Sequence, residues 1–156
     1  DNIAWANLTT GARCDIDDLP ANSVIYGKLY NWYAATDSRK IAPAGWHVPS
    51  DAEWATLIAF LGGETVAGGK LRETGTEHWL PTNSTATNSS GFTGLGTGYC
   101  NLDGDFTSLN YNTYFWTTTE LNTTSAIDYG FYYQTAESFR YDDTKTTGFP
   151  IRCIMD

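Results

Sequence analysis

Basic residues are scarce in this sequence of 156 residues. Nine Lys and Arg stand against 18 Asp and Glu, so the formal net charge at pH 7 is −9. No three basic residues stand together anywhere in the chain. Nucleic acids and anionic membrane surfaces are bound mainly through clustered Lys and Arg. The charge therefore argues against nucleic acid as a partner and against an anionic membrane surface as the main partner.

Long apolar runs are also absent. The longest apolar stretches, around residues 57–61, are far shorter than the roughly 20 residues that a membrane-spanning helix needs. We therefore expect no membrane insertion by this domain. The length predicts a single domain over residues 1–156, because ordinary domains contain about 100 to 200 residues.

Motifs for catalysis, metal binding and phosphate binding are missing as well. The sequence contains no His-Glu-x-x-His, Cys-x-x-Cys or Gly-x-Ser-x-Gly motif and no phosphate loop. His47 stands in an apolar run, which favours a structural role, and His78 is interpreted as a surface loop residue. The aspartates at 103, 105, 142 and 143 lack the spacing of a calcium loop. We predict no catalytic residue, no metal site and no cofactor.

One segment has clear helix signals. Ser50 followed by Glu53 forms a capping box, and acidic residues fill the first turn. Apolar residues then recur at helical spacing from Trp54 to Leu61, and two glycines end the pattern at residues 62–63. A second, shorter helix is expected over residues 64–73, although its own glycine pair weakens the signal.

The remaining pattern indicates strands and turns. Residues 24–33 are rich in β-branched and aromatic side chains and predict one or two strands. After residue 90, short apolar runs at 114–116, 126–133, 138–141 and 149–154 alternate with turn residues, and Asp103-Gly104 predicts a hairpin. The expected class is α+β, with two helices early and a β-rich, loop-rich C-terminal half.

Tyrosine is concentrated in the C-terminal part. Seven of the ten tyrosines lie in residues 98–156, among many Thr, Asp, Asn and Ser. This mixture is typical of antibody-like binding surfaces, where Tyr supplies stiff contact area and small polar residues supply adaptable hydrogen bonds. The competing interpretation is ordinary strand composition, since β-strands are rich in Tyr and Thr.

Six segments together resemble a known family. They are 26–35 (YGKLYNWYAA), 42–54 (APAGWHVPSDAEW), 67–71 (AGGKL), 87–92 (TNSSGF), 115–120 (FWTTTE) and 148–153 (GFPIRC). From about residue 7 to the C-terminus, the sequence resembles the Fibrobacter succinogenes major paralogous domain. The resemblance implies a variant of the C-type lectin-like fold, similar to the formylglycine-generating group, in a secreted or surface-attached bacterial protein.

Several features of related groups are not matched. The copper-binding cysteine pair of formylglycine-generating enzymes is missing, and so are the Glu-Pro-Asn and Trp-Asn-Asp motifs of calcium-dependent lectins. Neither activity is therefore implied. Cys14 and Cys153 lie in family-like contexts at the two ends of the domain, which implies a disulfide between them and leaves Cys100 free.

Some members of this family are diversified by retroelements that randomise a C-terminal cassette. The resemblance therefore implies a scaffold over residues 1–97 and a variable ligand-binding region over residues 98–153. The predicted function is that of a non-enzymatic ligand-binding domain of a bacterial surface or pilus-tip adhesin, with a protein or a glycan on another cell or host surface as the partner. The alternatives are a surface structural module without diversification and, less favoured, a carbohydrate-active enzyme, for which spacing selects no carboxylate pair.

Eight residues are predicted to contact the ligand. Their side chains are large or charged and lie between the family motifs. They are Tyr111, Tyr114, Asp128, Tyr132, Tyr133, Tyr141, Asp142 and Asp143. We expect the five rings to be exposed on one side, with the three aspartates at the edge. The competing interpretation is packing of tyrosines on a strand face, with solvated aspartates in turns.

Overall fold

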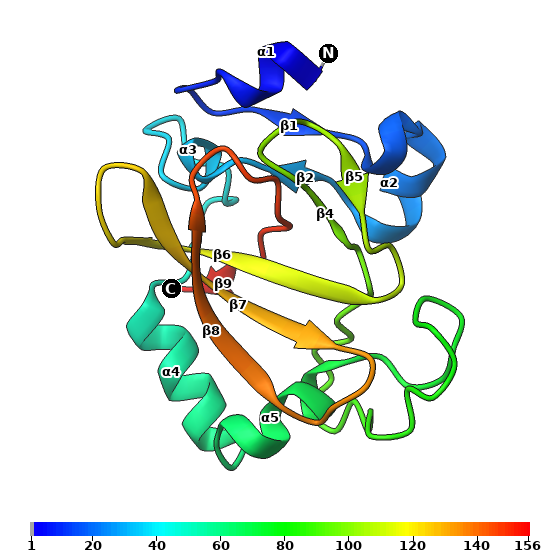
Figure 1. The fold of residues 1–156 in the computed structure, drawn as a ribbon. Coiled ribbons are helices and arrows are strands. Elements are labelled where there is room, and N and C mark those ends of the chain that lie inside the picture. The colour runs from blue at the N-terminus through cyan, green and yellow to red at the C-terminus, as the bar shows by residue number, and fades with distance from the viewer. Residues whose placement is uncertain (1) are drawn as a thin grey trace.

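The computed structural model describes residues 2–156, which form five α-helices and several small antiparallel sheets (Figure 1). The helices are α1 (Asn2–Ala6), α2 (Pro20–Tyr26), α3 (Trp32–Ala35), α4 (Asp51–Phe60) and α5 (Glu64–Leu71), with a 3-10 turn η1 (Ile16–Asp18). The strands are β1 (Arg13–Cys14), β2 (Leu29–Tyr30), β3 (Trp46–His47), β4 (Tyr99–Cys100), β5 (Phe106–Thr107), β6 (Asn112–Glu120), β7 (Ser125–Tyr132), β8 (Ser138–Thr144) and β9 (Ile154–Met155). The predicted α+β class is confirmed.

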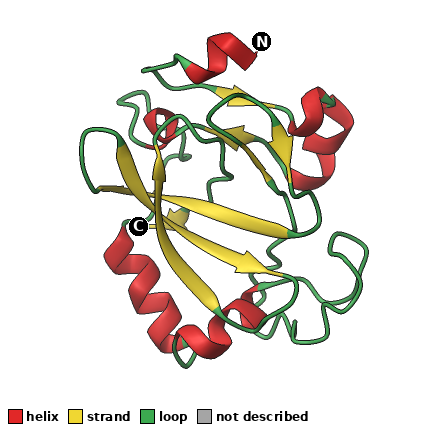
Figure 2. Ribbon diagram, in the orientation of Figure 1, coloured by secondary structure: helices red, strands yellow, loops and turns green. Residues whose placement is uncertain are grey.

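The largest sheet has three antiparallel strands in the order β6-β7-β8. It runs through the middle of the molecule, with α4 and α5 on one side and the N-terminal elements with β4 and β5 on the other (Figures 1 and 2). Residues 98–153 thus supply the central sheet, and both faces of that sheet have neighbours to pack against.

Strand alternation divides the apolar side chains of this sheet between two cores. Phe115, Ile127, Tyr129 and Phe131 face α4 and α5, where the Trp54 ring stacks on the Tyr129 ring at 5.3 Å. The opposite face joins a second core, whose buried members are Trp32, Ala35, Val48, Trp116, Ala126 and Phe149. Residues 126–131 of β7 are all buried because both faces of this strand are covered.

The predicted capping box is confirmed at the start of α4. The Ser50 hydroxyl accepts a hydrogen bond from the Glu53 amide at 3.4 Å, and the Ser50 amide donates to the Glu53 carboxylate at 2.8 Å. The second helix, α5, ends at Leu71, two residues earlier than expected. Its glycines are required by packing: a Cβ on Gly68 would lie 2.0 Å from the Glu137 carbonyl oxygen.

The prediction of strands over residues 24–33 is wrong for most of that segment. Pro20 starts α2 at a first-turn position, where its fixed φ suits a helix, and Gly27 ends the helix with a φ of 79°. Only Leu29 and Tyr30 form a strand, after which the Asn31 side chain accepts from the Ala34 amide and caps α3. Capping residues outweighed the strand preference of the aromatic and β-branched side chains.

The predicted hairpin at Asp103-Gly104 is confirmed. Strands β4 and β5 pair in antiparallel register, with Cys100 opposite Phe106. Gly104 has a φ of 89°, a conformation that glycine adopts without the steric cost borne by other residues. None of the helices in the described part of the chain is both long and apolar enough to cross a membrane.

The predicted disulfide between Cys14 and Cys153 is wrong in this structure. Cys14 lies on β1 opposite Leu29 and packs into a third core with Trp5 and Cys100. Cys153 packs instead against the second core. Cys14 and Cys153 therefore lie in different cores, and none of the three cysteines forms a disulfide.

Candidate functional site

Three tyrosines, one from each strand of the large sheet, point to the same face. Tyr114 lies on β6 opposite Gly130, Tyr132 lies two residues further along β7, and Tyr141 lies on β8 opposite Asp128. The Tyr132 hydroxyl is 2.7 Å from the Tyr114 hydroxyl and 3.3 Å from the Tyr141 hydroxyl. We call Tyr114, Tyr132 and Tyr141 the tyrosine triad.

Gly130 makes room for the triad. A Cβ on this residue would lie 2.7 Å from the Tyr114 ring and 3.3 Å from the Tyr141 ring. The two rings therefore lie over the backbone of β7 from either side. Any side chain at position 130 would push at least one of them away from Tyr132.

Two further tyrosines extend the triad at one end of the sheet. The Tyr111 ring centroid is 6.1 Å from that of Tyr132 and 5.1 Å from that of Tyr133. The Tyr133 amide donates to the Tyr111 carbonyl at 3.1 Å, which ties the two backbones together. We call the five residues the tyrosine array. The structure thus brings together all five tyrosines that the sequence predicted.

The rings of the tyrosine array are half-buried. Each of the five is partly accessible, unlike Tyr129 on the opposite face, which is 3% exposed. Burial raises the pKa of Tyr114, Tyr132 and Tyr141 above its ordinary value. The three hydroxyls are therefore neutral at physiological pH and can both donate and accept hydrogen bonds. This chemistry suits recognition of polar and apolar groups together.

Sequence reasoning missed several residues that hold the array. Phe139 packs its ring against Tyr132 and Tyr141, and Tyr99 packs edge-on against Tyr114. The Asn112 amide donates to the Tyr114 hydroxyl at 3.3 Å. The period-2 alternation of β6 and β8 would have placed Asn112 and Phe139 on the tyrosine face, whereas only the fold brings Tyr99 there.

The predicted positions of two aspartates are wrong. Asp128 was expected at the edge of the face, but it is fully buried, with 0% of its surface exposed. Asp142 is exposed, but it lies on the opposite face of β8 from Tyr141, because successive residues of a strand alternate. Only Asp143 shares the face of the triad and remains partly accessible.

Asp128, which is buried, and Asp143, which is partly accessible, form a carboxyl pair. Burial, and then the neighbouring Asp143, raises the pKa of Asp128 well above its ordinary value. Burial also raises the pKa of Asp143. Asp143 approaches Asp128 without reaching the geometry of an ordinary hydrogen bond, so both oxygens of Asp128 lack a regular partner among the described residues. Asp128 is therefore closed off from solvent, whereas Asp143 is partly accessible.

Both histidines have structural partners. His47 lies between Glu53 at 2.9 Å and Asp156 at 2.7 Å, and these carboxylates raise its pKa. His78 contacts the Glu73 carboxylate at 3.0 Å. Within residues 2–156, no three His, Cys, Asp or Glu side chains are grouped so that they could hold a metal ion.

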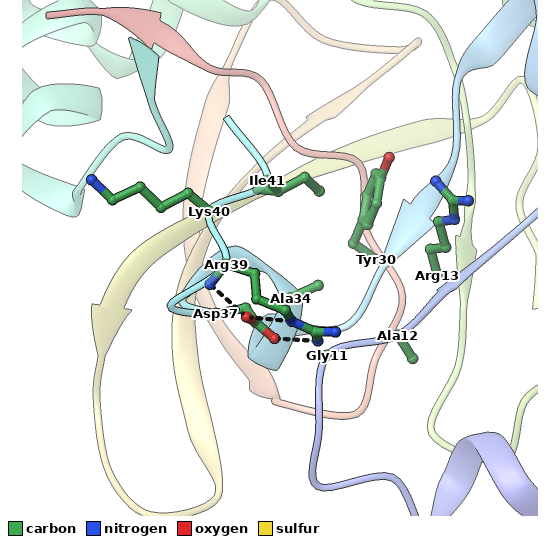
Figure 3. A pocket seen from close by; sticks show the side chains of 9 residues that line it. All are labelled: Gly11, Ala12, Arg13, Tyr30, Ala34, Asp37, Arg39, Lys40 and Ile41. Atoms are coloured by element: carbon green, nitrogen blue, oxygen red, sulfur yellow. Dashed lines mark hydrogen bonds and ion pairs between the residues drawn. The ribbon is translucent and has the colours of Figure 1, made fainter. Parts of the chain in front are cut away.

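A pocket of about 390 Å³ lies away from the tyrosine array, beside β1 and α3 (Figure 3). Three of the nine basic residues, Arg13, Arg39 and Lys40, line it. The Arg39 guanidinium is held by the Asp37 carboxylate at 2.6 Å, and Lys40 extends away from Arg13 and Tyr30 (Figure 3). The basic groups therefore do not converge on one point, as an anion site would require.

An apolar groove of about 420 Å³ lies along α4. Trp54, Leu57 and Phe60 line one side of it, with Phe92 and Ile154 among the residues opposite. Phe60 is 85% exposed. No residue that the sequence predicted to bind a ligand lines this groove.

Comparison with protein families gives a match over almost the whole chain. The model of the Fibrobacter succinogenes major domain, Fib_succ_major, matches residues 1–155. The chain belongs to this family. The match confirms the predicted resemblance and covers both the helices and the large sheet of this Fib_succ_major domain. Searches of curated proteins and of solved structures gave no significant match.

Proposed function

We propose that this Fib_succ_major domain is a non-enzymatic binding module that contacts a protein or a glycan through the tyrosine array. The observation that carries the proposal is the convergence of Tyr111, Tyr114, Tyr132, Tyr133 and Tyr141, which come from separate strands and turns. Partly exposed tyrosines combine a large, stiff apolar area with neutral hydroxyls, and such residues dominate the binding energy of many interfaces.

We further propose that the domain acts at a bacterial surface or pilus tip, with a C-type lectin-like fold, and that residues 98–153 are diversified by a retroelement. A scaffold can tolerate such variation when its backbone is held independently of the variable side chains. The backbone of β7 is paired on both sides, by β6 and by β8, and this favours the proposal.

The competing function is a structural module whose tyrosines only pack the domain. The hydrogen bonds within the triad favour it, because they would be formed whether or not a ligand exists. Tyr111 and Tyr133 distinguish the two functions, since they lie outside the triad. A packing role predicts that replacing them changes stability, whereas a binding role predicts that it changes binding.

Binding can be tested with an array of immobilised glycans and with fixed bacterial and epithelial cells, each probed with fluorescently labelled domain. We expect Tyr111→Ala and Tyr133→Ala to reduce a wild-type signal at least tenfold while the melting temperature changes little. Phe60→Ala is the matched control, since it removes an exposed aromatic ring in the apolar groove. Binding that survives both tyrosine substitutions but is lost in the control would place the site in the groove.

Diversification has its own test in the DNA. We expect a near-repeat of the segment that encodes residues 98–153, differing from it at adenines, beside a reverse transcriptase gene. Lack of such a repeat in the complete genome would leave a binding module with a fixed surface.

A further inference from the structure

Two of the three cysteines meet in the third core. Cys14 lies on β1 and Cys100 on β4, 86 positions apart in the sequence, yet both belong to the cluster that contains Trp5, Ile16 and Leu29. The Cys14 thiol lies 4.0 Å from the Leu29 carbonyl oxygen, and Cys14 and Cys100 lie near enough for each to shift the pKa of the other. The sequence alone does not predict this proximity, because β1 and β4 are far apart in the chain and only folding brings them together.

The backbones around both cysteines are fixed by pairing. Cys14 stands opposite Leu29 in the β1-β2 ladder. Cys100 exchanges two hydrogen bonds with Gly148, at 3.1 Å and 2.8 Å. A Cβ on Gly148 would lie 2.9 Å from the Cys100 Cβ and 3.5 Å from the Leu29 Cβ, so Cys100 is held close to the residue that faces Cys14.

The pair is also reachable from outside. A pocket of about 380 Å³ is lined by both cysteines, together with Trp5, Asp18 and Phe106. The Cys100 side chain is buried, whereas Cys14 is partly exposed. Cys153 lies in a different core and is not among the residues that line this pocket.

We propose that Cys14 and Cys100 form a disulfide bond when the domain meets a disulfide-carrying oxidant, and that Cys153 stays a free thiol. The bond would join the N-terminal segment to the beginning of the C-terminal half. This inference rests on the third core alone and stands whether or not the tyrosine array binds a ligand.

The reaction is an ordinary thiol–disulfide exchange. One cysteine thiolate attacks the disulfide of the oxidant, which forms a mixed disulfide and releases one thiolate of the oxidant. The second cysteine of the pair, as a thiolate, then attacks its partner's sulfur in the mixed disulfide and releases the second thiolate. The pair loses two protons and two electrons, and the oxidant accepts both electrons. The neighbouring Cys14 lowers the pKa of Cys100, whereas Cys100 and burial raise that of Cys14.

The test uses the whole chain and oxidised glutathione as the oxidant. After incubation, the protein is unfolded in guanidinium chloride without reductant and its remaining thiols are alkylated with iodoacetamide. Unfolding before labelling ensures that burial cannot imitate bonding. We expect one alkyl group on the wild type and none on Cys153→Ser. Peptide mapping without reduction should show one cross-linked pair, which contains Cys14 and Cys100.

Stability gives a second readout. A reductant should lower the melting temperature of the oxidised wild type and of oxidised Cys153→Ser by roughly 10 °C, since the bond closes a long loop. Cys14→Ser, whose altered side chain is the more exposed of the pair, should show no such shift. Three alkyl groups on the oxidised wild type, or a cross-link that contains Cys153, would overturn the proposal. The wild-type mapping decides the matter even if a serine variant fails to fold.

Discussion

Tyr114 and Tyr132 hold their hydroxyl oxygens 2.7 Å apart although they lie on different strands and their own backbones are not paired with each other. The contact is made possible by Gly130, which is the residue paired with Tyr114. Tyr132 is the central member of the triad because it alone contacts both other hydroxyls. This arrangement leads to different expectations for the three tyrosines.

Replacing the central hydroxyl should cost more than replacing an outer one. Tyr132→Phe removes both contacts, so we expect a loss of about 1 to 2 kcal/mol in the free energy of unfolding. Tyr141→Phe removes only the 3.3 Å contact and should cost about 0.5 kcal/mol or less. Urea unfolding of both variants checks this order. Equal losses would mean that the hydroxyls do not act as a connected triad.

Two glycines should differ in their tolerance of alanine. Gly68→Ala places a Cβ 2.0 Å from the Glu137 carbonyl oxygen, which is backbone and cannot turn away. Gly130→Ala meets the Tyr114 ring, which can rotate. Overpacking typically costs about 1 to 3 kcal/mol, so we expect the upper end or beyond for Gly68→Ala and the lower end for Gly130→Ala. Denaturant midpoints of the two variants measure the difference.

The capping box at α4 gives a prediction that was available from the sequence. Ser50→Ala leaves the Glu53 amide without its side-chain acceptor and should reduce stability by about 1 kcal/mol. Ser38→Ala, in an exposed turn, is the matched control and should change stability by less than about 0.5 kcal/mol. Equal melting temperatures of the two variants would contradict the role of Ser50 as a cap.

Asp128 should make the domain less stable as the pH rises. Its folded pKa lies above its unfolded value, so the folded state holds the proton more tightly, and stability falls as the pH rises above the unfolded pKa. Asp128→Asn keeps the shape without this charge. We expect the variant to gain stability over the wild type on going from pH 4 to pH 7, as measured by urea unfolding. Asp142→Asn is the exposed control, and a gain of the same size there would refute the explanation by burial.

The sequence predicted those features that depend on near neighbours in the chain. The capping box, the hairpin at Asp103-Gly104 and the common face of Tyr114, Tyr132 and Tyr141 each follow from residues a few positions apart or from strand alternation. The family match was likewise predictable, because its motifs are local runs of sequence.

Features that depend on the packing of distant segments were not predictable. Asp128 occupies a position on the tyrosine face, but Trp116 and the rest of the second core cover that end of the sheet and bury it. The partner of Cys14 depends on how β1 and β4 meet, and sequence spacing carries no such information. Residues 24–33 show how helix starts can outweigh strand preference. Pro20 starts the helix that includes residues 24–26, and Asn31 caps the helix that follows, although the side chains of this segment favour strands.

Strand β8 is an outer strand of the large sheet, with β7 as its neighbour on one side. An outer strand offers unpaired backbone groups on which a strand from another molecule can add, and charged side chains oppose such addition. Arg140 and Asp142 stand on β8 as exposed charges, and Arg140 is anchored to Asp51 at 2.8 Å. These charges therefore oppose edge-to-edge pairing of two copies of the domain through β8. Neutralising both charges should make the domain more prone to aggregation.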